Sequence, residues 1–157
     1  MNSANPVGHL VLYLCDYRDE ERQRLSDQTC TALQLANFWQ DVTVDLQKDR
    51  VYLPLDLLDQ HSYTVEELFA FKFDSRFEAV MRDAVEVAEG LFQKGLPLIG
   101  KVNRRLALDL ELFSRGGLKV LQKIRSQGYN VLQSRPHISK AERVGILLQC
   151  LPRLLRF

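Results

Sequence analysis

The sequence predicts an all-α protein, a compact bundle of about six or seven helices. Three observations predict this class. Apolar residues recur at helical spacing along most of the chain, two capping boxes mark helix starts, and no segment has the alternating pattern of a convincing β-strand. At 157 residues the chain has the length of one domain.

The composition is that of a soluble globular protein, with 46% apolar and 26% charged residues. No apolar run approaches the roughly 20 residues that span a bilayer. The N-terminus, MNSANPVGHL, lacks the basic and apolar regions of a signal peptide, which favours a cytoplasmic location. Cysteines are odd in number and show no C-x-x-C spacing, so neither a disulfide framework nor a zinc site is expected.

The first elements follow from apolar runs and charge. Residues 7–14 (VGHLVLYL) are predicted to form the end of a core helix, and the charged residues 16–24 a connector or helix start. A long helix is then predicted over residues 25–46. It cannot continue through residues 48–54, because Pro54 forces its predecessor out of the α conformation.

Capping boxes locate two later helix starts. Thr64 to Glu67 (TVEE) begins a short helix, and Ser139 to Glu142 (SKAE) begins the last one. Between them, residues 74–94 repeat apolar side chains at three- and four-residue intervals, which predicts an amphipathic helix of five to six turns.

Glycines are expected to divide the segments that follow. Residues 95–97 (GLP) should break the amphipathic helix, which resumes over residues 98–113. The pair at 116–117 should punctuate the chain before another helix over residues 118–127, and Gly128 is the expected C-cap residue.

One strip of polar side chains stands out in the long predicted helix. At about 100° per residue, Gln34, Asn37, Asp41 and Asp45 fall within one narrow sector. Apolar side chains cover nearly every other direction, and only Gln40 interrupts them, which is typical of a helix enclosed by apolar neighbours. These apolar residues are Leu33, Leu35, Phe38, Trp39, Val42, Val44 and Leu46.

Two carboxylates in such a setting need a partner, because an unpaired buried charge is very costly. Asp41 and Asp45 lie one turn apart, roughly 6 Å along the axis, which suits oxygen-preferring Mg²⁺. The amides of Asn37 and Gln34 could bind metal-bound water or phosphate oxygens. The alternative is that both aspartates are ordinary exposed carboxylates paired with Arg or Lys.

The loop after the strip adds a cation. Arg50 and Tyr52 follow Asp45 closely, and a guanidinium suits a diphosphate group. A structural salt bridge from Arg50 to Asp49 or Asp45 is the alternative.

Charge is distributed unevenly along the chain. Residues 115–157 hold nine Lys or Arg against one acidic residue, whereas the formal net charge of the whole chain is +1. This asymmetry favours an anionic partner such as diphosphate or a lipid surface. Nucleic acid is not expected, because no aromatic and basic stacking motif accompanies the charge. The last helix could contact a membrane, although packing on the bundle is the preferred interpretation.

The strip and its loop together carry a family resemblance. The pattern Q-x-x-N-x-x-x-D-x-x-x-D, followed by R-x-Y-L-P, resembles the second aspartate-rich motif of the squalene/phytoene synthase family, most closely its hydroxysqualene-forming branch in bacterial hopanoid synthesis. The resemblance runs from about Asn5 to the C-terminus. It corresponds to the C-terminal half of a family member, so residues 1–157 would form a partial isoprenoid synthase fold without the first aspartate-rich motif.

The resemblance implies an Mg²⁺-dependent enzyme that joins prenyl diphosphates head to head, converting farnesyl and presqualene diphosphates to hydroxysqualene or squalene. Phytoene-type synthesis is the alternative product chemistry. Asp41 and Asp45 would be catalytic metal ligands supported by Asn37, with substrate contacts from Gln34, Arg50 and Tyr52. Tyr129, in the segment GYNVL before Arg135 and Pro136, would line the prenyl channel. From the residues alone, an interface tyrosine is preferred at position 129.

Three functional hypotheses follow for a chain that encodes one metal-binding wall. The first is an enzyme whose missing N-terminal half comes from another chain or from a longer gene product. The second is a non-catalytic helical fragment or pairing subunit. The third is a peripheral membrane module that uses the basic C-terminal third.

Overall fold

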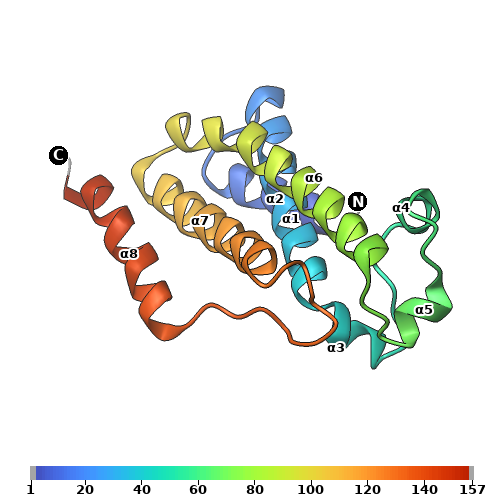
Figure 1. Ribbon diagram of the computed structural model, residues 1–157. Helices are drawn as coiled ribbons and strands as arrows, with labels where there is room; N and C mark the ends of the chain where they lie inside the picture. Colours follow the sequence, from blue (N-terminus) through green and yellow to red (C-terminus); the bar gives the residue numbers. More distant parts are fainter. Residues whose placement is uncertain (1–2, 156–157) are drawn as a thin grey trace.

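The structure is a computed structural model that describes the backbone of residues 3–155 and the side chains of residues 3–150. The described part is all helix, turn and loop, without strands, as the sequence predicts (Figure 1). The structure has three short helices that were not predicted as separate elements, at residues 42–46, 55–60 and 96–100. The elements are α1 (Ala4–Leu14), α2 (Glu20–Gln40), α3 (Val42–Leu46), α4 (Leu55–Gln60), α5 (Val65–Phe69), α6 (Ser75–Gly95), the 3-10 helix η1 (Leu96–Gly100), α7 (Arg104–Ser126) and α8 (Lys140–Leu155).

Helix α2 is the centre of the bundle and contacts α1, α6 and α7 (Figure 1). Its buried face meets one continuous apolar core. Trp39 is 2% exposed, and its indole N–H donates to the Ala84 carbonyl of α6 at 2.9 Å, so the largest core side chain also satisfies its polar atom. The other largest buried side chains of this core include Tyr63, Phe77, Met81, Phe92, Leu121 and Ile124.

The long helix predicted over residues 25–46 is interrupted in the structure. It begins earlier, at Glu20, because the Asp19 carboxylate accepts from the Arg22 N–H at 3.0 Å and caps the first turn. It ends at Gln40, where Asp41 leaves helical geometry with φ −101° and ψ 11°, and α3 follows. The predicted single helix was therefore wrong at Asp41, inside the motif strip.

The capped helices are confirmed. Thr64 and Glu67 form a reciprocal capping box at the start of α5, and Ser139 and Glu142 exchange the same two hydrogen bonds at α8. Helix α6 covers residues 75–95 after the N-cap Asp74 and buries the predicted apolar face.

The glycine pair at 116–117 does not punctuate the chain, contrary to expectation. Helix α7 runs unbroken from Arg104 to Ser126 because Gly117 serves close packing: a Cβ there would lie 2.3 Å from Phe92 Cζ and 3.2 Å from Leu33 Cδ2. Gly128 does end α7 as predicted. It has φ +64°, and the N–H groups of Gly128 and Tyr129 bond to Arg125 and Ile124 carbonyls in a Schellman arrangement.

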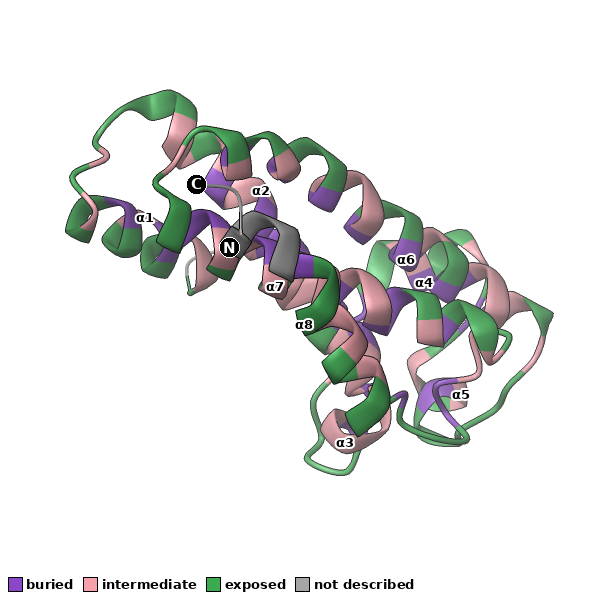
Figure 2. Ribbon diagram, turned by 90° about the vertical axis from the view of Figure 1, so that its left-hand side faces the viewer, coloured by how far each residue is buried: buried purple, intermediate pink, exposed green. Residues whose placement is uncertain are grey.

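Helices α1 and α8 lie at the edge of the bundle with large parts of their surface exposed (Figure 2), and both expose apolar side chains. The segment expected to be a core helix forms α1, but only Gly8 and Leu12 of that helix are buried. Its exposed apolar side chains are Val7, Leu10, Val11, Tyr13 and Leu14. Helix α8 packs on α7 and exposes Val144, Leu147 and Leu148. Within the described chain, no helix is both long and apolar enough to cross a bilayer.

Candidate metal and diphosphate site

The interruption at Asp41 leaves the two motif carboxylates in register. The Asp45 N–H still donates to the Asp41 carbonyl at 2.8 Å, which is the four-residue bond of an α-helix. Asp41 and Asp45 therefore remain one turn apart, Asp41 at the end of α2 and Asp45 in α3. Both residues are partly exposed, so neither carboxylate is a buried charge.

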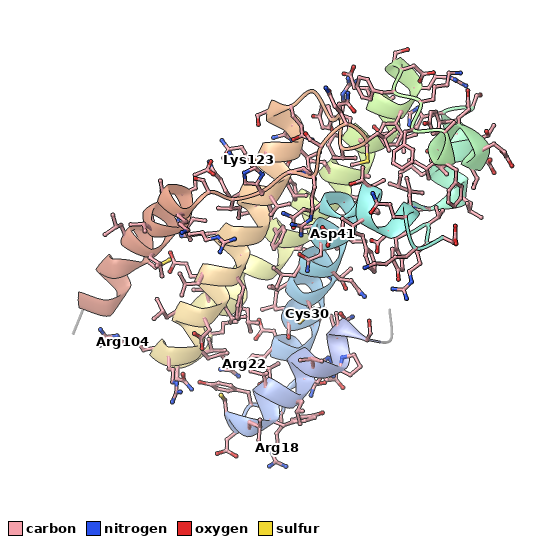
Figure 3. The ribbon with its side chains drawn as sticks, turned by 90° about the horizontal axis from the view of Figure 1, so that it is seen from below. Arg18, Arg22, Cys30, Asp41, Arg104 and Lys123 are labelled. Atoms are coloured by element: carbon pink, nitrogen blue, oxygen red, sulfur yellow. The ribbon has the colours of Figure 1, made fainter. Side chains whose placement is uncertain are left out.

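Asp41 has an arginine partner from a distant part of the chain. Arg135 lies in the loop between α7 and α8, and its Nε donates to Asp41 Oδ1 at 2.5 Å (Asp41 is labelled in Figure 3). The neighbouring residue Gln40 donates its side-chain N–H to the Pro136 carbonyl at 2.6 Å. This contact explains the one polar residue that interrupts the apolar sides of the motif helix.

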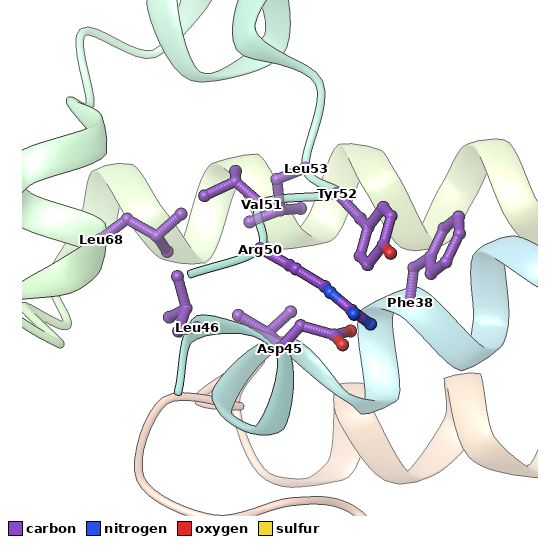
Figure 4. Close-up of a pocket in the computed structure, with 9 residues that line it drawn as sticks. Phe38, Asp45, Leu46, Arg50, Val51, Tyr52, Leu53 and Leu68 are labelled. Carbon is purple, nitrogen blue, oxygen red and sulfur yellow. The ribbon is translucent and has the colours of Figure 1, made fainter. Parts of the chain in front are cut away.

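Asp45 lies beside Arg50 because of the turn between them. Asp49 adopts a left-handed φ of 55°, and the Arg50 N–H donates back to the Asp45 carbonyl at 3.0 Å. The chain therefore returns over α3, and Figure 4 shows the Arg50 guanidinium and the Asp45 carboxylate directed to the same side of one hollow. The sequence predicted this proximity.

Aromatic residues wall the same hollow. The rings of Phe38 and Tyr52 stack with centroids 4.1 Å apart and planes 4° from parallel (Figure 4). The hollow measures about 10 Å³, which is room for about one water molecule. It is too small for a prenyl chain or a diphosphate, so the described residues provide a wall of a site rather than an enclosed cavity.

The remaining motif residues lie along α2. Asn37 is exposed, one turn before Asp41, and its carbonyl accepts the Asp41 N–H at 2.9 Å. Gln34 is half-buried and donates to Ser3 Oγ at 2.9 Å, one further turn away. The four residues keep their one-turn spacing along the backbone, but Gln34 is engaged by the start of α1 and Asp41 by Arg135.

Tyr129 lies elsewhere than the hollow. Its hydroxyl accepts from Arg125 Nε at 3.3 Å, and Arg82 of α6 lies over its ring at 5.7 Å from the centroid. These contacts place it between α6 and the C-terminal end of α7, and it does not line the hollow beside Asp45. Its partly buried ring and hydrogen-bonded hydroxyl match the interface tyrosine that the residues alone favoured.

The donor set fits Mg²⁺ in kind. Asp41 and Asp45 are carboxylates one turn apart, and Mg²⁺ commonly takes one or two protein carboxylates together with water and phosphate oxygens. In the part of the chain that is described, no three His, Cys, Asp or Glu side chains converge as a complete metal cage. The site would therefore bind a cation weakly without a substrate phosphate or further ligands.

Comparisons with known proteins agree with this architecture. The model of the family described as squalene/phytoene synthase matches residues 1–142. A phytoene synthase of Thermus thermophilus is 40% identical over 146 residues, covering 92% of this chain and 49% of that protein. A hydroxysqualene synthase of Sinorhizobium fredii is 31% identical over 144 residues, covering 89% of this chain and 48% of that protein.

Solved structures give the same result. The squalene synthase HpnC of Alicyclobacillus acidocaldarius superposes with a TM-score of 0.80 and 43% identity, over 82% of this chain and 49% of that one. A dehydrosqualene synthase superposes with a TM-score of 0.84 over 96% of this chain and 53% of that one, at 20% identity, and so supports the fold alone.

Fold and site together define a helical domain of the isoprenoid synthase type, with an acidic motif at the end of its central helix. The chain belongs to the squalene/phytoene synthase family. It spans about half the length of the relatives that it matches.

Two features of the site were not predicted from the sequence. The first is the Arg135 contact with Asp41, across 94 residues. The segment containing Arg135 and Pro136 carried the family resemblance, but nothing local indicates its partner. The second is the stacking of Phe38 on Tyr52, for which the only sequence signal was that both flank the motif.

Proposed function

We propose that this chain supplies the C-terminal wall of an Mg²⁺-dependent enzyme that acts on prenyl diphosphates. The observation that carries the proposal is that Asp45 and Arg50 line one hollow with the Phe38 and Tyr52 rings, and that Asp41 lies one helical turn before Asp45. It combines oxygen ligands for a cation, a guanidinium for phosphate and an apolar wall for a hydrocarbon chain.

Each side chain has a physical role in this proposal. Asp41 and Asp45 would hold Mg²⁺, with Asn37 binding metal-bound water through its amide. The bound cation supplies charge neutralisation for the departing diphosphate. Arg50 can pair with the same diphosphate through its planar fork. The Phe38 and Tyr52 rings would give a carbocation an apolar wall, and covering this wall in the completed site would keep out the water that quenches the carbocation.

Among product chemistries we favour conversion of farnesyl and presqualene diphosphates to hydroxysqualene, as in hopanoid synthesis. The sequence of the motif and the 43% identity to a squalene synthase structure support this choice. Phytoene-type coupling is the second candidate, supported by the 40% identity to a phytoene synthase.

A second set of helices would complete the site. The hollow beside Asp45 holds about one water molecule in about 10 Å³. Helix α1 exposes an apolar face of Val7, Leu10 and Leu14, with Leu14 78% exposed. An apolar face of this kind is typical of a surface that another protein element covers. We infer that helices equivalent to the other half of the relatives, from another chain or a longer product, cover it. The alternative is that this chain is a pairing subunit that does not take part in catalysis.

A fusion tests the proposed function. The N-terminal half of the Alicyclobacillus squalene synthase, joined to this chain, is expected to convert farnesyl diphosphate to a C30 product in the presence of Mg²⁺, as measured by gas chromatography with mass spectrometry. Geranylgeranyl diphosphate offered in parallel reports phytoene-type chemistry. A well-folded fusion that consumes neither substrate would favour the non-catalytic pairing subunit.

Peripheral membrane contact is a second candidate function, favoured by the orientation of α8. Its only acidic residue in the described part, Glu142, faces α7, where Lys123 approaches at 2.8 Å and Lys119 at 3.4 Å. The hydrogen bond from Lys123 and the Ser139 backbone N–H lower the pKa of Glu142 to about 2. Gln149 is exposed, and its side-chain oxygen accepts from Arg115 of α7 at 3.0 Å.

The outward face of α8 is apolar and basic. Val144, Leu147 and Leu148 are 53–58% exposed, and Lys140 and Arg143 are exposed as well. A stripe of this type at the edge of a basic segment fits an anionic lipid surface. Among the described residues, this face exposes three apolar side chains, whose area is far below the roughly 800 Å² per partner of a stable protein interface.

Vesicle binding checks this candidate. The chain is expected to co-sediment with phosphatidylglycerol-containing vesicles and less with pure phosphatidylcholine, more weakly at high salt. Replacing Leu147 and Leu148 by Gln should lower binding about tenfold or more, because two leucines lose their burial in lipid. Val87→Gln, an exposed apolar position on α6, serves as the control. Equal loss in both variants, or equal binding to both lipids, would contradict the assignment.

A further inference from the structure

Arg135 occupies an oxygen of Asp41 that a cation would use. Its Nε lies 2.5 Å from Asp41 Oδ1, and the next residue, Pro136, is held by Gln40 at 2.6 Å. These two contacts fasten the loop between α7 and α8 to the end of α2. Pro136 is buried, so the loop is anchored by packing as well as by polar contacts.

We propose that Arg135 is an internal counter-ion that competes with the divalent cation for Asp41 and sets the cation concentration at which the site fills. The inference rests on the proposed function. The physical reason is that a guanidinium and a metal ion at one carboxylate repel each other, so the cation must displace the arginine or share Asp41 with it.

Exposure determines how strong this competition is. The side chains of Asp41 and Arg135 are 32% and 47% exposed, so water and salt screen the pair. Exposed ion pairs of this kind contribute up to about 1 kcal/mol, which corresponds to at most about a fivefold change in an equilibrium constant. The arginine would therefore weaken cation binding without preventing it.

Release of Arg135 would change the loop locally. The Gln40 contact to Pro136 remains, and Gln127 still donates to the Ser134 carbonyl at 3.1 Å. Helix α8 also keeps its ion pair between Lys123 and Glu142. Loosening is therefore expected around residues 133–137 and not in the helices on either side.

Cation titration of the 157-residue chain tests the competition. Mn²⁺ is the probe, with free Mn²⁺ measured by electron paramagnetic resonance and Mg²⁺ added as a competitor. Arg135→Gln should bind Mn²⁺ about twofold to fivefold more tightly than the wild-type chain. The matched control is Arg143→Gln, an exposed arginine on α8 that should leave the affinity unchanged.

Hydrogen exchange gives a second measurement that does not depend on activity. In the wild-type chain, amide exchange of residues 133–137 should rise when Mg²⁺ is added. In Arg135→Gln it should be raised already without the cation. Equal or weaker Mn²⁺ binding by Arg135→Gln, with binding abolished by Asp41→Asn, would overturn the competition and leave the metal site standing. Failure of every form to bind Mn²⁺, with inorganic pyrophosphate present as well as without it, would overturn both.

Discussion

Asp45→Asn in an active fusion enzyme is expected to lower kcat/KM by at least about a hundredfold. Asn keeps the size and shape of the side chain but removes the negative charge that a metal ligand supplies, and losses of this order follow from removing a ligand of the reacting metal. The fold should survive, because Asp45 is only partly buried and its backbone bonds to Asp41 and Arg50 do not involve the side chain. Steady-state kinetics with farnesyl diphosphate, at several Mg²⁺ concentrations, measure the loss.

The chain offers a closely matched control for this substitution. Asp49 lies one turn further on, is exposed, and has a left-handed φ of 55° that Asn adopts readily. Asp49→Asn therefore makes the same chemical change at the same end of the molecule and should leave kcat/KM within about twofold, as exposed carboxylates contribute little. Turnover near wild type in Asp45→Asn, or an equal loss in both variants, would count against a metal-binding role.

Local patterns accounted for most of the helices. The apolar repeat of residues 74–94 predicted α6, and the capping boxes at Thr64 and Ser139 predicted the starts of α5 and α8. These features depend on residues within one or two turns of each other, which a sequence displays directly. The same holds for Gly128, because the Schellman turn places one residue in a left-handed conformation.

Failures arose where distant residues decide the structure. Gly117 was interpreted as a break, but the helix continues because the missing side chain makes room for Phe92. Glycine as a helix terminator and glycine as a packing contact look alike in a sequence. The exposure of α1 was missed for a related reason, since an apolar run does not say what covers it.

In the candidate site, too, local patterns predicted some features and contacts between distant residues were missed. Helical spacing was enough to place Asp41 and Asp45 one turn apart, and the short loop was enough to bring Arg50 to Asp45. The partner of Asp41 depends on a loop 94 residues away, and no local pattern predicts it. Tyr129 was linked to the prenyl channel by resemblance alone, and this link stays a prediction. Its contacts with Arg82 and Arg125 show only that it does not line the small hollow beside Asp45.

The close contact between α6 and α2 leads to the largest expected change in stability. A Cβ on Gly95 would lie 2.2 Å from Thr29 Oγ1, 2.9 Å from Thr29 N and 3.2 Å from the Leu25 carbonyl oxygen. Two of these three atoms belong to the backbone of α2, and Thr29 is only 3% exposed, so neither helix can yield by turning a side chain. We expect Gly95→Ala to lower the free energy of unfolding by about 2 kcal/mol or more.

A second glycine of α6 separates this packing effect from helix propensity. A Cβ on Gly90 would meet no atom within 4 Å, so Gly90→Ala should raise the free energy of unfolding by about 0.5–1 kcal/mol, as expected for alanine in a helix interior. Thermal unfolding followed by circular dichroism measures both, and the Gly95→Ala loss corresponds to a Tm lower by about 4–8 °C. If both variants gained stability, α6 would not approach α2 as closely as the structure shows.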